Sequence, residues 1–160
     1  MSPHVNNDTL DSWIGLLACP DCRGDLAREG TGLVCRSCAR GYEVHDGIPL
    51  LARPGSSEQW GVPSDGPTSV TYQKQFQQSD IGELYRRRYQ RRWSKRCTTH
   101  REIHRIGRLL ASQPRCRRLL DLPCGGGRVS GPLASATDLL LQADLSLGQV
   151  LTARETMGAS

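Results

Sequence analysis

Two cysteine pairs with identical internal spacing constrain the fold of this chain more than any other feature. Cys19-Pro20-Asp21-Cys22 and Cys35-Arg36-Ser37-Cys38 are CxxC turns separated by twelve residues. A CxxC turn directs two thiolates at one point, and two such turns supply the four soft ligands of a tetrahedral zinc site. Because four cysteines leave no position for water, the predicted zinc is structural. A redox-active CxxC pair is the alternative interpretation.

Size and cysteine count support the metal interpretation. A segment as short as residues 14–52 does not build an adequate hydrophobic core by itself, so bound zinc would supply folding free energy. The total of seven cysteines is odd, which argues against a complete disulfide framework. We expect the other three to be free thiols, and we assign no nucleophile among them: Cys97, Cys116 and Cys124.

The sequence around the cysteines resembles that of a known family. The stretches LLACPDCRGDL and GLVCRSCARGYEVHDGIPLL resemble the small zinc-ribbon proteins that serve as activating subunits of tRNA, rRNA and protein methyltransferases. The resemblance covers about residues 14–52 and includes the turn Asp46-Gly47-Ile48-Pro49. Glu43 departs from it, since relatives often carry proline there. The resemblance implies four zinc ligands, and a ribbon that packs beside a methyltransferase, as a separate chain or fused to it: Cys19, Cys22, Cys35 and Cys38.

The C-terminal half predicts strands and helices around a glycine turn. In RRLLDLPCGGGRVSG an apolar run ends at Asp121 and leads into three glycines. Residues 119–122 and 139–143 are predicted strands. Helices are predicted over 81–93, over 103–110, over 128–136 and from about Ser146. Glycines allow a backbone to approach a ligand closely, and the following helix start offers N–H donors. This arrangement is typical of a nucleotide-cofactor site at the carboxyl end of a strand.

The spacing of the glycines limits which class of cofactor the turn could bind. The dinucleotide pattern GxGxxG/A is broken at Ser130, and no GxxxxGK phosphate loop exists. The pattern D-x-x-x-G-x-G, formed by Asp121, Gly125 and Gly127, resembles motif I of class I S-adenosylmethionine-dependent methyltransferases, although Pro123 replaces the usual first glycine. The run LLLQADLSLGQVL, with Asp144, resembles their post-I motif.

Those resemblances imply roles for particular residues. Asp144 would bind the adenosine ribose, and Asp121 would hold the ammonium group directly or through water. The backbone of Gly125, Gly126 and Gly127 would face the methionine end of the cofactor. Two simpler interpretations stay open: the glycines form only a turn, and Asp144 caps the helix that begins near Ser146.

The expected architecture is α/β: a small β zinc ribbon followed by an incomplete Rossmann-like methyltransferase domain with its first two parallel strands and helices. We divide the chain into an N-terminal tail (1–13), the ribbon (14–52), a linker (53–79) and the methyltransferase segment (80–160). Because residue 160 follows directly after the second expected strand and its helix, we expect a truncated enzyme that is inactive by itself. Catalytic residues remain unassigned, because acceptor residues usually follow the fourth strand in that superfamily.

Residues 86–118 are strongly basic, with thirteen Lys and Arg against Glu102 alone. One interpretation is RNA binding, with arginines on phosphates and Tyr89 or Trp93 stacked on bases. We favour the other, in which the aromatics share a buried helix face with Ile81 and the arginines form the solvated opposite face. RNA stays a candidate methyl acceptor.

The main functional hypothesis is an S-adenosylmethionine-dependent methyltransferase with a structural zinc ribbon. Its alternatives are a non-catalytic ribbon that docks on a separate methyltransferase chain and activates it, and an RNA-binding zinc ribbon. No apolar run approaches the ~20 residues that span a bilayer, and the N-terminus lacks a secretory pattern. We therefore expect a cytoplasmic protein without a membrane partner.

Overall fold

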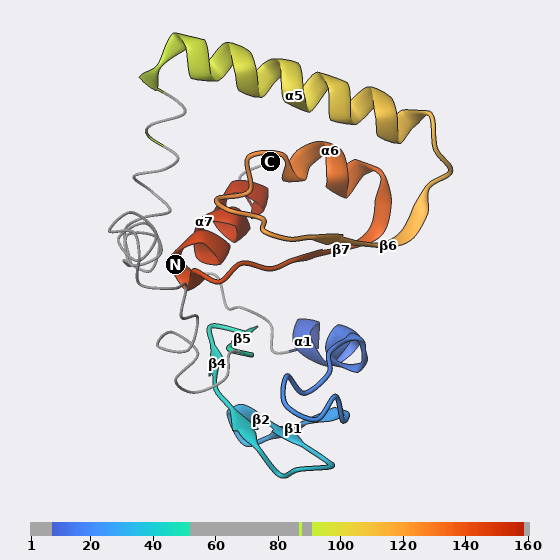
Figure 1. Ribbon diagram of the computed structural model, residues 1–160, viewed down its shortest axis with the longest axis vertical. Coiled ribbons are helices and arrows are strands. Elements are labelled where there is room, and N and C mark those ends of the chain that lie inside the picture. The colour runs from blue at the N-terminus through green and yellow to red at the C-terminus, as the bar shows by residue number, and fades with distance from the viewer. Residues whose placement is uncertain (1–7, 52–86, 88–90, 159–160) are drawn as a thin grey trace, which may run out of the picture. The chain divides into compact units, whose positions relative to one another are not determined.

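The computed structural model describes residues 8–51, Arg87 and residues 91–158, and it divides into two compact units, 1–61 and 62–160 (Figure 1). The predicted linker at 53–79 and two positions of the predicted buried helix face, Ile81 and Tyr89, lie outside the described residues. None of the helices in the described part is both long and apolar enough to cross a membrane.

The second unit contains a parallel strand pair. Its elements, in chain order, are α5 (Trp93–Ala111), β6 (Cys116–Asp121), α6 (Ser130–Ser135), β7 (Thr137–Gln142) and α7 (Leu147–Gly158). Strands β6 and β7 pair in parallel, from Cys116 opposite Thr137 to Asp121 opposite Gln142, with α6 as the crossover between them. The predicted order of strand, glycine turn, helix, strand and helix is confirmed. The mixed α/β class is confirmed with it.

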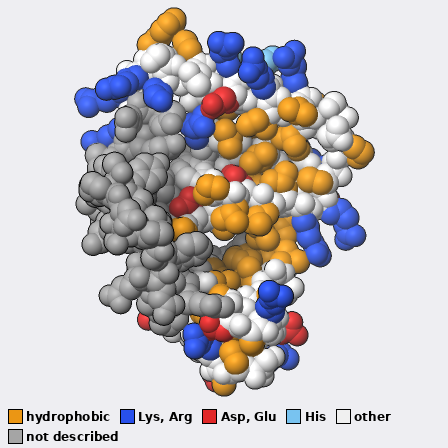
Figure 2. Space-filling model, in the orientation of Figure 1, with side chains coloured by type: hydrophobic (Ala, Val, Ile, Leu, Met, Phe, Trp, Pro, Cys, Tyr) orange, Lys and Arg blue, Asp and Glu red, His pale blue; other side chains and the backbone are white. Residues whose placement is uncertain are grey.

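Helix α5 differs from its sequence prediction in extent and orientation. It begins at Trp93, the last position of the first predicted helix, and continues through the second predicted helix at 103–110 as one element. The side chain of Trp93 is 78% exposed, so the prediction of a buried aromatic stripe is wrong at this position. The half-buried face of α5 contains Ile103, Ile106 and Leu110. Because an α-helix rotates by about 100° per residue, Trp93 does not lie on this face. Figure 2 shows Lys and Arg side chains gathered over this helix.

The first unit is a set of short antiparallel strands preceded by two helical turns. Its elements are α1 (Asp8–Trp13), the 3-10 helix η1 (Ile14–Leu16), β1 (Leu26–Glu29), β2 (Gly32–Cys35), β3 (Gly41–Tyr42), β4 (Val44–His45) and β5 (Ile48–Pro49). Strands β1, β2 and β3 form one sheet in that order, and β4 pairs with β5. The register places Leu26 opposite Cys35 and Leu33 opposite Tyr42.

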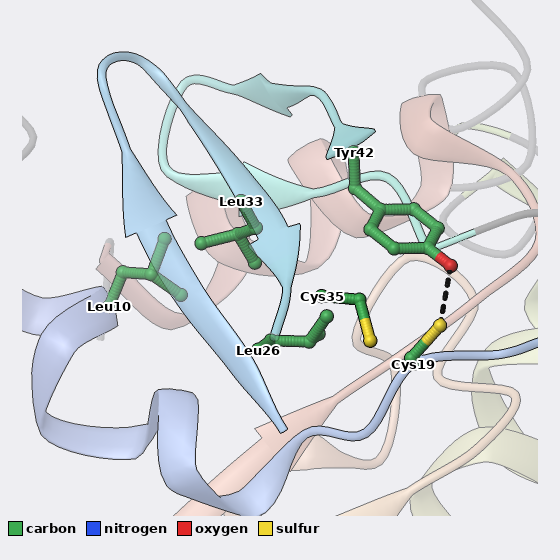
Figure 3. Packing of buried hydrophobic residues seen from close by; sticks show 6 residues of the cluster. All are labelled: Leu10, Cys19, Leu26, Leu33, Cys35 and Tyr42. Atoms are coloured by element: carbon green, nitrogen blue, oxygen red, sulfur yellow. Dashed lines mark hydrogen bonds between the residues drawn. The ribbon is translucent and has the colours of Figure 1, made fainter. Parts of the chain in front are cut away.

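A small core lies on one face of the three-stranded sheet (Figure 3). Leu33 and Cys35 are two residues apart on β2, and both are buried because alternate side chains of a strand share a face. Leu10 joins this core from α1, with 2% of its surface exposed. The packed region therefore begins before residue 14, where the sequence places the start of the ribbon. The core brings four apolar side chains together with two sulfurs: Leu10, Leu26, Leu33 and Tyr42 with Cys19 and Cys35.

Candidate metal centre

The four paired cysteines converge on one point. Their Sγ atoms all lie within 4.8 Å of one another. Two of these approaches join one sulfur from each turn: Cys19 to Cys38 at 3.7 Å and Cys22 to Cys35 at 3.4 Å. A tetrahedron of thiolates with Zn–S near 2.3 Å has sulfur–sulfur edges of about 3.8 Å. All four are free cysteines, so the sulfur positions match a zinc tetrahedron rather than disulfides.

The two turns that present the sulfurs have the same backbone geometry. In each, the residue four positions after the first cysteine donates its N–H to that cysteine's carbonyl: Arg23 to Cys19 at 2.8 Å and Ala39 to Cys35 at 2.9 Å. Arg23 and Ala39 also share a left-handed backbone, with φ of 62° and 56°. Equal spacing in the sequence thus produces two matching knuckles that face each other.

Gly24 lets the knuckles approach closely. A Cβ at this position would overlap the Ser37 side chain of the other knuckle and lie 3.1 Å from the Cys35 sulfur. A side chain here would force the second knuckle away from the first. The absence of a Cβ, rather than an unusual backbone angle, is what this position requires.

A series of polar side-chain contacts leads from the four-cysteine cluster to the surface. Tyr42 Oη lies 2.9 Å from Cys19 Sγ and 3.3 Å from Asp21 Oδ2, and Arg40 forms an ion pair with the same Asp21 oxygen at 2.6 Å. The sequence motifs do not predict these contacts. Their signal in the sequence is the Gly41-Tyr42 step after the second knuckle, which places Tyr42 on β3 opposite Leu33.

These contacts favour thiolate at the buried sulfurs. Burial alone would raise the pKa of Cys19. The hydrogen bond with Tyr42 and the backbone N–H groups of Cys22 and Asp21 outweigh burial, and they lower the pKa to about 6. The Cys38 backbone N–H likewise lowers the pKa of Cys35 despite its burial. Although the Gly24 N–H opposes it, contact with the Cys35 and Cys38 sulfurs raises the pKa of Cys22 to about 12, and the pKa of Cys38 is raised as well. One sulfur of each knuckle is thus favoured as a thiolate, and the other would release its proton when a soft divalent metal binds.

The predicted cofactor residues lie around one turn in the second unit. Asp144 Oδ2 accepts the N–H of Gly125 at 2.9 Å, and its Oδ1 accepts the N–H of Ser146 at 3.0 Å. Asp121 Oδ2 accepts the hydroxyl of Ser130 at 3.3 Å. Each carboxylate therefore contacts the turn or the helix that follows it. The Ser146 contact is also the geometry of the helix-cap interpretation.

The three glycines of the turn have different surroundings. A Cβ on Gly127 would lie 2.9 Å from Ala153 Cα, and one on Gly126 would lie 3.2 Å from Thr152 Cγ2, so both glycines pack under α7. Gly125 has φ of +52° and no atom within 4 Å of such a Cβ. Of the three, only Gly125 is open to a ligand, and the other two let α7 approach the turn.

Cys124 lies beside these carboxylates and is buried. Burial raises the pKa of its thiol to about 12, and the charges of Asp144 and Asp121 add to the effect. A neutral thiol is a weak nucleophile and a poor metal ligand. The structure is consistent with the decision to assign Cys124 no catalytic role.

Comparisons with known proteins concern the cysteine region. Residues 15–47, which include all four cysteines, match a family model described as Trm112p-like protein. The UPF0434 protein of Hahella chejuensis is 42% identical over 40 residues, which are 24% of this chain and 67% of that protein. No solved structure matches the chain significantly.

Proposed function

This chain belongs to the family of the UPF0434 protein, and its residues 15–47 match the Trm112p-like model; we propose from that match that its first unit is a zinc ribbon that docks on a methyltransferase chain and activates it. The observation that carries the proposal is the convergence of four sulfurs within 4.8 Å, on two matching knuckles inside the matched residues. This favours the non-catalytic alternative over an enzyme acting through its own active site.

Zinc in this ribbon would be structural. Cys19, Cys22, Cys35 and Cys38 would hold it with no position left for water or substrate, so the metal supplies folding free energy rather than Lewis-acid catalysis. The buried cluster contains only six residues, too few for a stable core without such a link. With zinc bound, Tyr42 would donate its single hydroxyl proton to the Cys19 thiolate in place of Asp21 Oδ2, which makes the thiolate less basic. The reduced thiolates that this site requires fit a cytoplasmic location.

A two-part experiment tests this function. The purified chain should contain one zinc per molecule by elemental analysis, and Cys19→Ser should lose it, whereas Cys97→Ser, which alters a cysteine in α5, should keep it. The chain should then be co-expressed with each class I methyltransferase encoded in the source genome. At least one should copurify with it and transfer more methyl groups with the wild-type chain than with Cys19→Ser. A zinc-loaded chain that binds and activates none of them overturns the proposal.

A second function rests on the glycine turn. Residues 80–160 would be the N-terminal part of an S-adenosylmethionine-binding domain, with the ribbon at 14–52 and a linker at 53–79. The contact of Asp144 with Gly125, at the carboxyl ends of two parallel strands, favours it. Asp144 would bind the ribose, Asp121 the ammonium, and the Gly125–Gly127 backbone would border the methionine end. S-adenosylmethionine would supply the activated methyl group.

Calorimetry distinguishes a glycine turn that binds the cofactor from one that has only a structural role. Titration with S-adenosylhomocysteine should show weak binding by the wild-type chain, lost in Asp144→Ala and kept in Asp138→Ala. Asp138 is a suitable control because its carboxylate is exposed and pairs with Arg115 away from the turn. Equal heats from all three chains would remove Asp144 from any such site. We expect no methyl transfer by the isolated chain, and sustained turnover would contradict that expectation.

A further inference from the structure

Helix α5 concentrates positive charge on a face that packs against none of the described elements. It contains five Lys and Arg residues and one acid, Glu102, which pairs with Arg128 on the half-buried side. Four arginines are exposed, and none of the four forms an ion pair within the described ranges 8–51 and 91–158: Arg96, Arg101, Arg105 and Arg108. Their charge is therefore available to an outside partner.

An aromatic residue lies at the first position of α5, before the exposed arginines. Trp93 is 78% exposed, and from it the exposed positions follow at spacings of three or four residues. Such spacing keeps side chains on one helix face. We call this row the basic stripe, and it spans about 22 Å of helix at 1.5 Å per residue. It consists of Trp93, Arg96, His100, His104 and Arg108, flanked by Arg101 and Arg105.

The combination indicates the chemistry of the partner. Guanidinium groups bind phosphates, and an exposed indole ring offers a flat surface on which a base can stack. A single strand of nucleic acid presents phosphates and unpaired bases together, whereas a duplex keeps its bases stacked inside. An anionic membrane would require a continuous apolar face, and the basic stripe contains only one large apolar side chain.

We propose that the basic stripe of α5 binds single-stranded nucleic acid, with the arginines on successive phosphates and Trp93 stacked on a base. This interaction goes beyond the proposed role of the ribbon, because it uses residues of the second unit only. It also reverses the preference drawn from the sequence, since the buried aromatic face that argued for a merely solvated helix does not include Trp93.

Fluorescence anisotropy with a labelled short oligouridylate tests the proposal on the full zinc-loaded chain. Contacts to about four phosphates predict that log K falls with log salt at a slope of about −3. Loss of stacking in Trp93→Ala should weaken binding about tenfold, and Trp93→Phe should retain most of it. Removing two stripe charges, in Arg101→Gln/Arg105→Gln, should lower the salt slope by about one.

A matched variant distinguishes the stripe from general positive charge. Arg117→Gln/Arg118→Gln removes the same charge from exposed positions of β6, outside α5. Arg118 lies on the same face of β6 as the exposed Leu120. Asp121, which contacts Ser130 on α6, lies on the opposite face. This variant should bind nearly as the wild type does. Equal losses in the two double variants would overturn the proposal. So would binding that is unchanged in Trp93→Ala, duplex RNA bound as tightly as the single strand, or anionic vesicles bound in preference to it.

Discussion

The hydroxyl of Tyr42 lies 2.9 Å from the sulfur of Cys19, inside the ribbon core and away from solvent. This contact connects a proposed zinc ligand to Asp21, and through Asp21 to Arg40 at the surface. It also orients the Cys19 side chain, because Tyr42 is held by the register of β3 against β2. The tyrosine thus belongs to the candidate metal centre, although it would supply no ligand atom.

Replacing Tyr42 by phenylalanine should weaken zinc binding without abolishing it. The ring stays in the core, but the Cys19 sulfur loses its hydrogen-bond donor, and such outer partners are typically worth 10–100-fold in metal affinity. Competition against a chromophoric zinc chelator measures the change. Glu43→Gln, at the exposed neighbouring position, should leave the affinity unaltered. An affinity for Tyr42→Phe equal to the wild type would show that the contact does not tune the site.

Truncating Leu10 should destabilise the ribbon even though the residue precedes the cysteine region. Leu10 is 2% exposed, so Leu10→Ala leaves a cavity and should cost about 2–5 kcal/mol. Leu109→Ala, on a side chain that is 66% exposed, should cost little. Denaturant unfolding of the zinc-loaded chain measures both, with a probe in the first unit for Leu10→Ala and a probe in the second unit for Leu109→Ala. A stable Leu10→Ala ribbon would mean that α1 is not part of this core.

Alanine at Gly127 should destabilise the second unit more than alanine at Gly125. Both glycines have positive φ, at +76° and +52°, but only at Gly127 would the new Cβ meet backbone, 2.9 Å from Ala153 Cα. We expect about 1 kcal/mol at Gly125 from backbone strain and about 3 kcal/mol or more at Gly127 from strain and overlap together. Gly131→Ala, in open space within α6, is the control. Thermal unfolding ranks the three, and equal losses at Gly125 and Gly127 would contradict the packing of α7 on the turn.

Alkylation of Cys124 should be slow at neutral pH and accelerate only in strong base. Burial, with Asp144 and Asp121 nearby, raises the pKa of the thiol to about 12, so the reactive thiolate is scarce until the pH approaches that value. Iodoacetamide labelling at a series of pH values, read by peptide mass spectrometry against free glutathione, measures it. Labelling of Cys124 as fast as glutathione at pH 8 would contradict both the burial and the charge effect.

The sequence was sufficient for features that depend on local spacing. Two CxxC turns of equal length dictate two equal knuckles, and the sulfurs of Cys19 and Cys38 meet as the spacing predicts. The apolar runs on either side of Gly125 likewise predict two strands with a helix between them, because short runs with turn residues at their ends have few other structures. The position of Asp144 beside the turn follows from the parallel pairing of those strands.

Only the tertiary structure decided which distant residues meet. The hydroxyl of Tyr42 reaches Cys19 across 23 positions of the chain, α7 covers Gly126 and Gly127, and Trp93 points to solvent instead of into a core. No periodicity within one element predicts such contacts, because they depend on how the separate elements pack against one another. Spacing specifies what a short segment can form, and packing specifies which of its faces is buried.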